Sequence, residues 1–266
     1  MEGGFLAIDG GNSRLKATLF PKADGEPEVK IFDSDDTDDL LAYISDCGAA
    51  SGAMACVSHV DPRLLETLRL VFRERFLAVT PSTELPIGVS YPRPETLGID
   101  RKATAVAAHD LYPCERSLVI DAGSAVTCDV VGPEGFIRGS ISPGLSMRLR
   151  ALHEFTARLP QVARPVAGEA LPEWARTTEG AILSGVAAGF LNEVLADIVN
   201  LGAGVYGAVR VLLTGGDAAY ILNGLPRLPL LAAQREALEK ISIVHEPHLL
   251  AKGVRAIYIH HENEYK

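Results

Sequence analysis

The chain of 266 residues has few cysteines and no pattern that would use them together. The four are Cys47, Cys56, Cys114 and Cys128. None of them forms a C-x-x-C pair, and no histidine stands at zinc-ligand spacing from them. The sequence therefore predicts neither a disulfide framework nor a zinc site. We expect reduced, mostly packed thiols, as in a cytoplasmic protein.

Other absences narrow the range of functions. The formal net charge is −9, with 34 acidic residues against 25 lysines and arginines. That balance argues against a surface that coats nucleic acid, although local groups can still bind an anion. The start, Met-Glu-Gly-Gly, lacks the basic region of a signal peptide, and Asp9 interrupts the apolar run behind it. We also expect no apolar stretch of membrane-spanning length.

The Walker pattern G-x-x-x-x-G-K-[ST] is absent, which excludes a P-loop NTPase. One G-x-G-x-x-G occurs, at residues 202–207. It follows a predicted helix and precedes a predicted strand, which is the reverse of the dinucleotide-binding context. We interpret it as a helix C-cap and loop. Neither of these two common motifs therefore indicates a phosphate-binding segment in this chain.

Helix and strand patterns alternate along the chain, which is typical of an α/β fold. The segment FLAIDGGNSRLKATLF, residues 5–20, predicts a buried strand that ends at Asp9, a Gly-rich turn and a half-buried strand. The segment SLVIDAGSAVTCDVV, residues 117–131, repeats this plan around Asp121. The two aspartates lie 112 positions apart, a typical domain length. We therefore predict two duplicated domains, residues 1–115 and 116–266.

Turns of this kind suit phosphate groups. Glycines remove the Cβ atoms that would keep oxygens away from open backbone N–H groups, and Asp9 can hold Mg²⁺ beside them. Lys16 can place a positive charge near a transferring phosphoryl group. Further hydrogen-bond donors are Asn12, Ser13, Ser124 and Thr127. The pattern predicts that the hairpins clamp the phosphate tail of a nucleotide.

Two other segments leave alternatives open. Asp100 precedes a predicted helix, so it is either the N-cap or a carboxylate that accepts a proton from a substrate hydroxyl. Arg101 and Lys102 follow at once and would favour an anion at this point. Gly215-Gly216-Asp217 follows a predicted strand and opens a helix. It is either a cradle for the adenosine or ribose end of a nucleotide or a purely structural turn.

Three motifs in this order resemble type III pantothenate kinase. They are D-x-G-N-S-x-x-K at residues 9–16, L-G-x-D-R at 97–101 and D-x-G-[ST]-A-x-T-x-D at 121–129. The resemblance extends over about residues 5–253. That family belongs to the superfamily of acetate and sugar kinases, Hsp70 and actin. The resemblance therefore implies two duplicated ribonuclease H-like (actin-like ATPase) domains, with mixed sheets flanked by helices.

The resemblance also implies an activity: transfer of the ATP γ-phosphoryl group to pantothenate, giving 4′-phosphopantothenate in the first step of coenzyme A biosynthesis. Asp100 would be the catalytic base, Asp9 would lie near Mg²⁺, and Asp121 would hold K⁺ or NH₄⁺. The implied ATP-binding residues are Asp9, Gly10, Gly11, Asn12, Ser13, Arg14, Leu15, Lys16 and Ser124. The implied pantothenate-binding residues are Tyr91, Gly98, Ile99, Asp100, Arg101 and Thr178. Thr178 would reach the substrate across a homodimer interface.

The chain departs from the family pattern at two places. Ser124 stands where the family usually has threonine, and it keeps the hydroxyl group. Thr177 stands where the family has an asparagine before its substrate-binding threonine. Two rival functions are another small-molecule kinase of the superfamily and a non-catalytic nucleotide-binding regulator. The L-G-I-D-R cluster disfavours the first, and the three intact aspartates disfavour the second.

Overall fold

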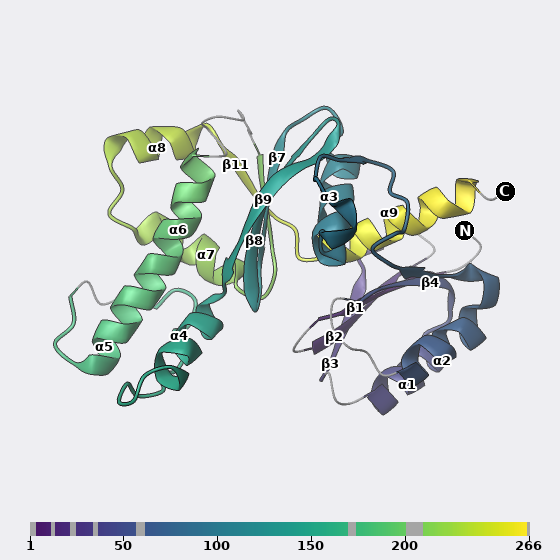
Figure 1. Ribbon diagram of the computed structural model, residues 1–266, viewed down its shortest axis with the longest axis horizontal. Helices are drawn as coiled ribbons and strands as arrows, with labels where there is room; N and C mark the ends of the chain where they lie inside the picture. Colours follow the sequence, from purple (N-terminus) through teal and green to yellow (C-terminus); the bar gives the residue numbers. More distant parts are fainter. Residues whose placement is uncertain are drawn as a thin grey trace. The chain divides into compact units, whose positions relative to one another are not determined.

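A computed structural model describes residues 4–11, 14–21, 25–33, 37–56, 62–169, 174–200 and 210–264 (Figure 1). The chain forms two compact units. Unit 1 comprises Met1–Pro113, Glu134–Ile137 and His248–Lys266, and unit 2 comprises Cys114–Pro133 and Arg138–Pro247. Unit 1 thus includes residues from beyond the predicted boundary at 115, because the C-terminal helix packs against its sheet and its helix α3.

Unit 1 contains a five-stranded mixed sheet in the order β3-β2-β1-β4-β5. The strands are β1 (Gly4–Gly10), β2 (Arg14–Phe20), β3 (Glu28–Asp33), β4 (Ala49–Cys56) and β5 (Phe76–Val79). β1 pairs antiparallel with β2 and parallel with β4. The N-terminal hairpin predicted from the sequence is confirmed, with Asp9 directly opposite Lys16.

Two pairs of helices give this sheet its two apolar cores. Helices α1 (Thr37–Asp46) and α2 (Pro62–Phe72) share one core with Leu6 and Ile8. Helices α3 (Ile99–Leu111) and α9 (Leu249–Glu264) share the other with Phe5 and Ala7. The four residues of β1 alternate between the cores because successive side chains of a strand point to opposite faces.

Unit 2 is built on β7 (Ser117–Ala122), β8 (Ala125–Gly132), β9 (Gly135–Pro143), β10 (Arg210–Thr214) and β11 (Ser242–His245). The sheet order is β11-β10-β7-β8-β9-β6. β7 and β8 form the second predicted hairpin, and β10 runs parallel to β7. The short strand β6 (Gly88–Val89) pairs with the first two residues of β9, which belong to unit 1. The α/β fold with two mixed sheets is confirmed.

The helices of unit 2 are α4 (Leu145–Glu154), α5 (Thr178–Leu183), α6 (Gly189–Asp197), α7 (Ala218–Gly224) and α8 (Ala232–Glu239). A π-helical turn, Ser184–Ala188, joins α5 to α6, so that residues 178–200 form one long helix. A single 3₁₀ turn, Leu225–Arg227, follows α7. In unit 1 the corresponding short turns are Arg73–Arg75 and Pro94–Thr96. The G-x-G-x-x-G at 202–207 lies outside the described residues.

The long helix corrects one expectation from the sequence. Thr178–Asn200 has 23 residues and a mean hydropathy of 1.6 in its most apolar window, so by length and composition alone it is long enough to span a membrane. In unit 2 one side of it is buried through Phe190, Leu191 and Val194. Exposed positions along it carry small residues, namely Ala181, Gly185, Gly189 and Ala196. The apolar composition thus partly reflects packing against the unit 2 core.

The contact between α3 and α9 gives a test of the fold. A Cβ atom at Gly253 would overlap the carbonyl oxygen of Ala103. We expect Gly253→Ala to destabilise the protein by about 1–3 kcal/mol, because the two helices must separate. Urea unfolding measures this. Ile259→Ala, at a partly exposed position of the same helix, is the control and should shift the midpoint far less. Equal midpoints for the two variants would contradict the close approach.

Candidate active site

The β1–β2 turn places an acid and a cation side by side. Asp9 and Lys16 are both half-buried and are register partners across the hairpin, which brings their Cβ atoms to about 4.5–5.5 Å. The Gly11 N–H donates to the carbonyl oxygen of Arg14 at 3.1 Å and closes the turn. Asn12 and Ser13, at its tip, lie outside the described residues. The described part brings together the carboxylate and the cation predicted to handle a phosphate group.

Asp100 is not the N-cap of α3. Gly98 occupies that position, and Asp100 is the second residue of the helix. Its Oδ1 accepts a hydrogen bond from the Arg101 N–H at 2.8 Å. A Cβ atom at Gly98 would overlap this oxygen, so glycine is what allows the carboxylate to fold back over the helix start. The interpretation of Asp100 as the N-cap is therefore wrong. Its half-buried carboxylate does, however, lie in the first turn of α3.

Two predicted substrate residues meet on one aromatic ring that the sequence reading missed. The Arg101 guanidinium lies over the ring of Phe136, 5.4 Å from its centre. Tyr91 meets the same ring edge-on, with the ring centres 6.0 Å apart and the planes at 78°. Both contacts hold Arg101 and Tyr91 in place beside the start of α3. Phe136 carries no signal in the sequence, because an apolar residue in a strand predicts only a core position.

The sequence predicts that Lys102, together with Arg101, favours an anion at the start of α3, but the Lys102 ammonium is engaged elsewhere. Its side chain is buried, and Nζ donates to the carbonyl oxygen of Pro81 at 2.6 Å. Burial lowers the pKa of this ammonium group, which Glu95 partly opposes. Lys102 thus ties α3 to the loop after β5.

In unit 2 the β7–β8 turn is packed closely against a second glycine turn. Asp121 ends β7 beside Thr214 of β10. Gly215 has a φ of +89°, which favours glycine, and a Cβ there would come within 2.6 Å of the Asp121 carboxylate. The Gly123 N–H closes the β7–β8 turn on Ala125 O at 2.9 Å, and Ser124 is exposed. The turn that carries Asp121 and Ser124 is therefore held rigidly from one side by the segment after β10.

Asp217 connects the surrounding segments to this turn. Its N–H donates to Ala122 O at 2.8 Å, and its carboxylate pairs with Arg164 at 2.7 Å. The carboxylate also accepts a hydrogen bond from the Leu145 N–H, at the first residue of α4. The Gly144 N–H in turn donates to Ser124 O at 2.9 Å. Burial raises the pKa of Asp217, and the hydrogen bonds and the guanidinium oppose that shift.

Thr178 begins the long helix and is exposed. The N-cap is Thr177, whose hydroxyl accepts a hydrogen bond from the Gly180 N–H at 3.1 Å. Thr177, which replaces the asparagine usual in the family, thus caps the helix, as asparagine would also do. The Thr178 side chain remains on the surface of unit 2.

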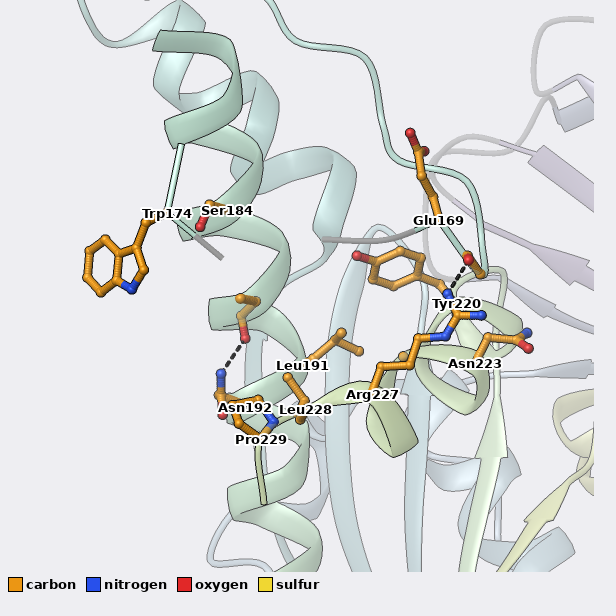
Figure 2. A pocket seen from close by; sticks show the side chains of 13 residues that line it. Glu169, Trp174, Ser184, Leu191, Asn192, Tyr220, Asn223, Arg227, Leu228 and Pro229 are labelled. Carbon is orange, nitrogen blue, oxygen red and sulfur yellow. Dashed lines mark hydrogen bonds between the residues drawn. The ribbon is translucent and has the colours of Figure 1, made fainter. Parts of the chain in front are cut away.

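A cavity of about 750 Å³ lies within unit 2, between the long helix and the α7 segment (Figure 2). Its walls include Leu191 and Leu228, and Tyr220 and Arg227 lie along it. It could not be predicted from the sequence, because its walls come from three separate segments. Among the residues that the structure describes, no group of three or more His, Cys, Asp or Glu side chains could hold a metal ion. Asp9 and Asp121, which the resemblance implies as ion ligands, belong to no such group.

Solved structures define the class of fold. The chain matches a Campylobacter jejuni protein described as a Baf family transcriptional activator, with a TM-score of 0.57, 22% identity and coverage of 97% of this chain and 99% of that one. It also matches Balamuthia mandrillaris glucokinase, with a TM-score of 0.53, 11% identity and coverage of 97% and 94%. At these identities the likeness concerns the fold alone, which is that of the sugar kinases and actin-like ATPases.

The sequence comparisons identify the family within that class. The sequence model of type III pantothenate kinase matches residues 5–199. The type III pantothenate kinase of Bacteroides fragilis is 39% identical over 214 residues, covering 80% of this chain and 85% of the relative. That of Azobacteroides pseudotrichonymphae is 31% identical over 265 residues, covering 98% and 99%. The chain belongs to the type III pantothenate kinase family, and it is a kinase.

The network around Asp217 gives a prediction for nucleotide binding. Asp217→Ala leaves Arg164 and the start of α4 without their carboxylate, so the β7–β8 turn should loosen. We expect ATP binding, measured by calorimetry, to weaken at least about 10-fold. Glu115→Ala is the matched control, because it breaks another ion pair of unit 2, with Arg210 at the opposite end of β10. Equal ATP affinities for the two variants would show that Asp217 does not support the turn.

Proposed function

We propose that the protein phosphorylates pantothenate with ATP, giving 4′-phosphopantothenate, the first step of coenzyme A biosynthesis. The family supports the reaction class. The observation that carries the proposal is the Asp100 carboxylate, folded over Gly98 at the start of α3 beside Arg101. A kinase needs one carboxylate for the acceptor hydroxyl and separate groups for the phosphates, and the two units supply both kinds.

Asp100 acts as the general base in this proposal. Its Oδ1 is engaged with the Arg101 N–H, which leaves Oδ2 to accept the proton of the pantothenate hydroxyl. The N-terminus of α3 favours negative charge at this point. Tyr91, Gly98, Ile99 and Arg101 frame pantothenate, and Phe136 supports the first and last of these side chains.

Mg²⁺-ATP supplies the phosphoryl group. We assign its phosphate tail to residues 9–16 and Ser124, because both belong to glycine-containing turns at the ends of buried strands. Lys16 neutralises charge that develops on the transferring group, and Asp9 lies close enough to Lys16 to hold Mg²⁺ on the same phosphates. Asp121 holds a monovalent cation, K⁺ or NH₄⁺. The closely packed backbone around it supports a site of fixed size.

We further propose that the enzyme is a cytoplasmic homodimer in which Thr178 reaches the substrate of the partner subunit. The exposed small residues of the long helix would let a second copy approach closely, and Phe155 and Trp174 are exposed aromatic side chains of the same unit. Sedimentation velocity of the purified protein decides between a dimer and a monomer.

The role of Asp100 has a direct test. We expect Asp100→Asn to lower kcat about 10²–10⁴-fold, because the amide cannot accept the proton, while ATP affinity stays within about twofold. The control is Asp110→Asn, at an exposed position of the same helix, with unchanged turnover. Turnover near the wild-type rate in Asp100→Asn would remove Asp100 from the role of base.

The substrate and the cation are tested together by measuring phosphorylation of pantothenate in K⁺ buffer and in Na⁺ buffer, with Mg²⁺ in both. We expect turnover in K⁺ that collapses in Na⁺, and we expect Asp121→Ala to lose the stimulation by K⁺. Unchanged K⁺ dependence in that variant would place the cation elsewhere. No turnover in either buffer, with ATP binding intact, would point to a different acceptor or to a regulator.

A further inference from the structure

One charged side chain of unit 1 is buried but has no part in the proposed reaction. Lys102, in α3, is 3% exposed, and among the described residues its Nζ donates to the carbonyl oxygen of Pro81 at 2.6 Å. An ammonium group that leaves water for one carbonyl oxygen gains little free energy of folding. An unbranched apolar side chain would fill the same space without that cost. Stability alone therefore does not account for a lysine at this position.

Lys102 contacts the loop that joins β5 to α3, residues 80–98. Pro81 is the second residue of this loop and accepts the hydrogen bond from Lys102. Glu95, close to the other end of the loop, attracts the same ammonium group and opposes the lowering of its pKa by burial. Both ends of the loop are thus drawn to one side chain of α3. Lys102 therefore closes the loop at its base.

The middle of the loop is held by a different set of contacts. Leu85 and Ile87 pack against the core that α3 and α9 share. The Ser90 N–H donates to Phe136 O at 2.9 Å, in the short pairing of β6 with β9. Tyr91 follows at once, and its ring meets that of Phe136 edge-on. The position of Tyr91 is therefore set by the strand pair on one side and by the base of the loop on the other.

Lys102 belongs to the same helical turn as two predicted substrate residues. Asp100 and Arg101 precede it directly in α3. Successive residues of an α-helix are about 100° apart around its axis, so Lys102 and Asp100 leave the helix on nearly opposite sides. Asp100 can therefore face the acceptor while Lys102 holds the loop. The bond to Pro81 fixes the distance between the loop and the helix start that carries Arg101.

We propose that Lys102 is a positioning residue for the acceptor substrate. By closing the loop 80–98 against α3, it keeps Tyr91 at the distance from Arg101 at which both side chains bind pantothenate. The inference rests on the proposed function, which assigns Tyr91 and Arg101 to pantothenate. It gives a role to a residue outside the three family motifs. Acceptor affinity then depends on Lys102, whereas ATP affinity does not.

Lys102→Met keeps the length of the side chain and removes its N–H donors. We expect KM for pantothenate to rise about 10-fold, because Tyr91 is no longer held in place, with kcat and KM for ATP within about twofold of the wild type. The melting temperature should stay within about 4 °C, because the exposed Pro81 can bind water through its carbonyl oxygen instead. An unchanged KM for pantothenate, or an equal rise in both KM values, would overturn the proposal.

The matched control is Ile44→Ala, which weakens the other core of unit 1 and leaves the loop alone. It should lower the melting temperature more than Lys102→Met does, because it opens a cavity in that core. We expect it to leave KM for pantothenate unchanged. If both variants raised that KM equally, loss of stability rather than the position of the loop would explain the effect, and the proposal would be wrong.

A second measurement needs no substrate. In hydrogen exchange of the ligand-free protein, we expect the amides of residues 83–97 to exchange at least about 10-fold faster in Lys102→Met than in the wild type, with those of β1 and β2 unchanged. Equal exchange in the two proteins would overturn the proposal. If the wild type did not phosphorylate pantothenate, the proposed function would fail, while faster exchange in the variant would still support Lys102 as the residue that positions the loop.

Discussion

The buried carboxylate of Asp217 is the interaction on which the arrangement of unit 2 depends. It joins a loop, a helix start and the segment after β10, and its own N–H holds Ala122. A carboxylate this deeply buried is unfavourable unless it is paired and hydrogen-bonded, and here the Arg164 guanidinium and the Leu145 N–H both donate to it. The free-energy cost of burying this carboxylate therefore fixes the positions of the segments bonded to it. Moving one of them away would leave the buried Asp217 carboxylate without a partner.

The two hairpins share a plan but are supported in different ways. In unit 1 the turn after β1 is closed by its own strands, and a lysine faces the aspartate across the ladder. In unit 2 no lysine stands opposite Asp121, whose register partner is Thr127. Instead, the backbone of Gly215 approaches its carboxylate closely. The two aspartates therefore have different surroundings, a lysine across the strand pair in one unit and a glycine turn in the other.

The sequence was sufficient for what is local. It predicted both hairpins, the helix before residues 202–207 and the strand after them, because strand alternation and helical spacing are properties of neighbouring residues. It misplaced the cap of α3 by two residues, since Gly98 fills that position without a side chain. It did not predict α8, none of whose residues is buried. Assignment to the family came from motif order, not from any of these patterns.

Contacts between distant residues could not be predicted. The Arg101–Phe136 and Arg164–Asp217 contacts join residues far apart in sequence, and a single sequence contains no information on such pairings. The cavity could not be predicted for the same reason, because three segments distant in sequence form its walls.

The π-helical turn at Ser184–Ala188 has a consequence for how the long helix can change in evolution. Such a turn holds one residue more than regular α-helix, which advances the helical phase beyond it by about 100°. Phe190, Leu191 and Val194, which face the core, lie beyond this turn, and Ile182 lies before it. Loss of a single residue there would leave a regular, continuous helix and yet rotate its second half. Different residues of the helix would then line the cavity, although no residue had been substituted.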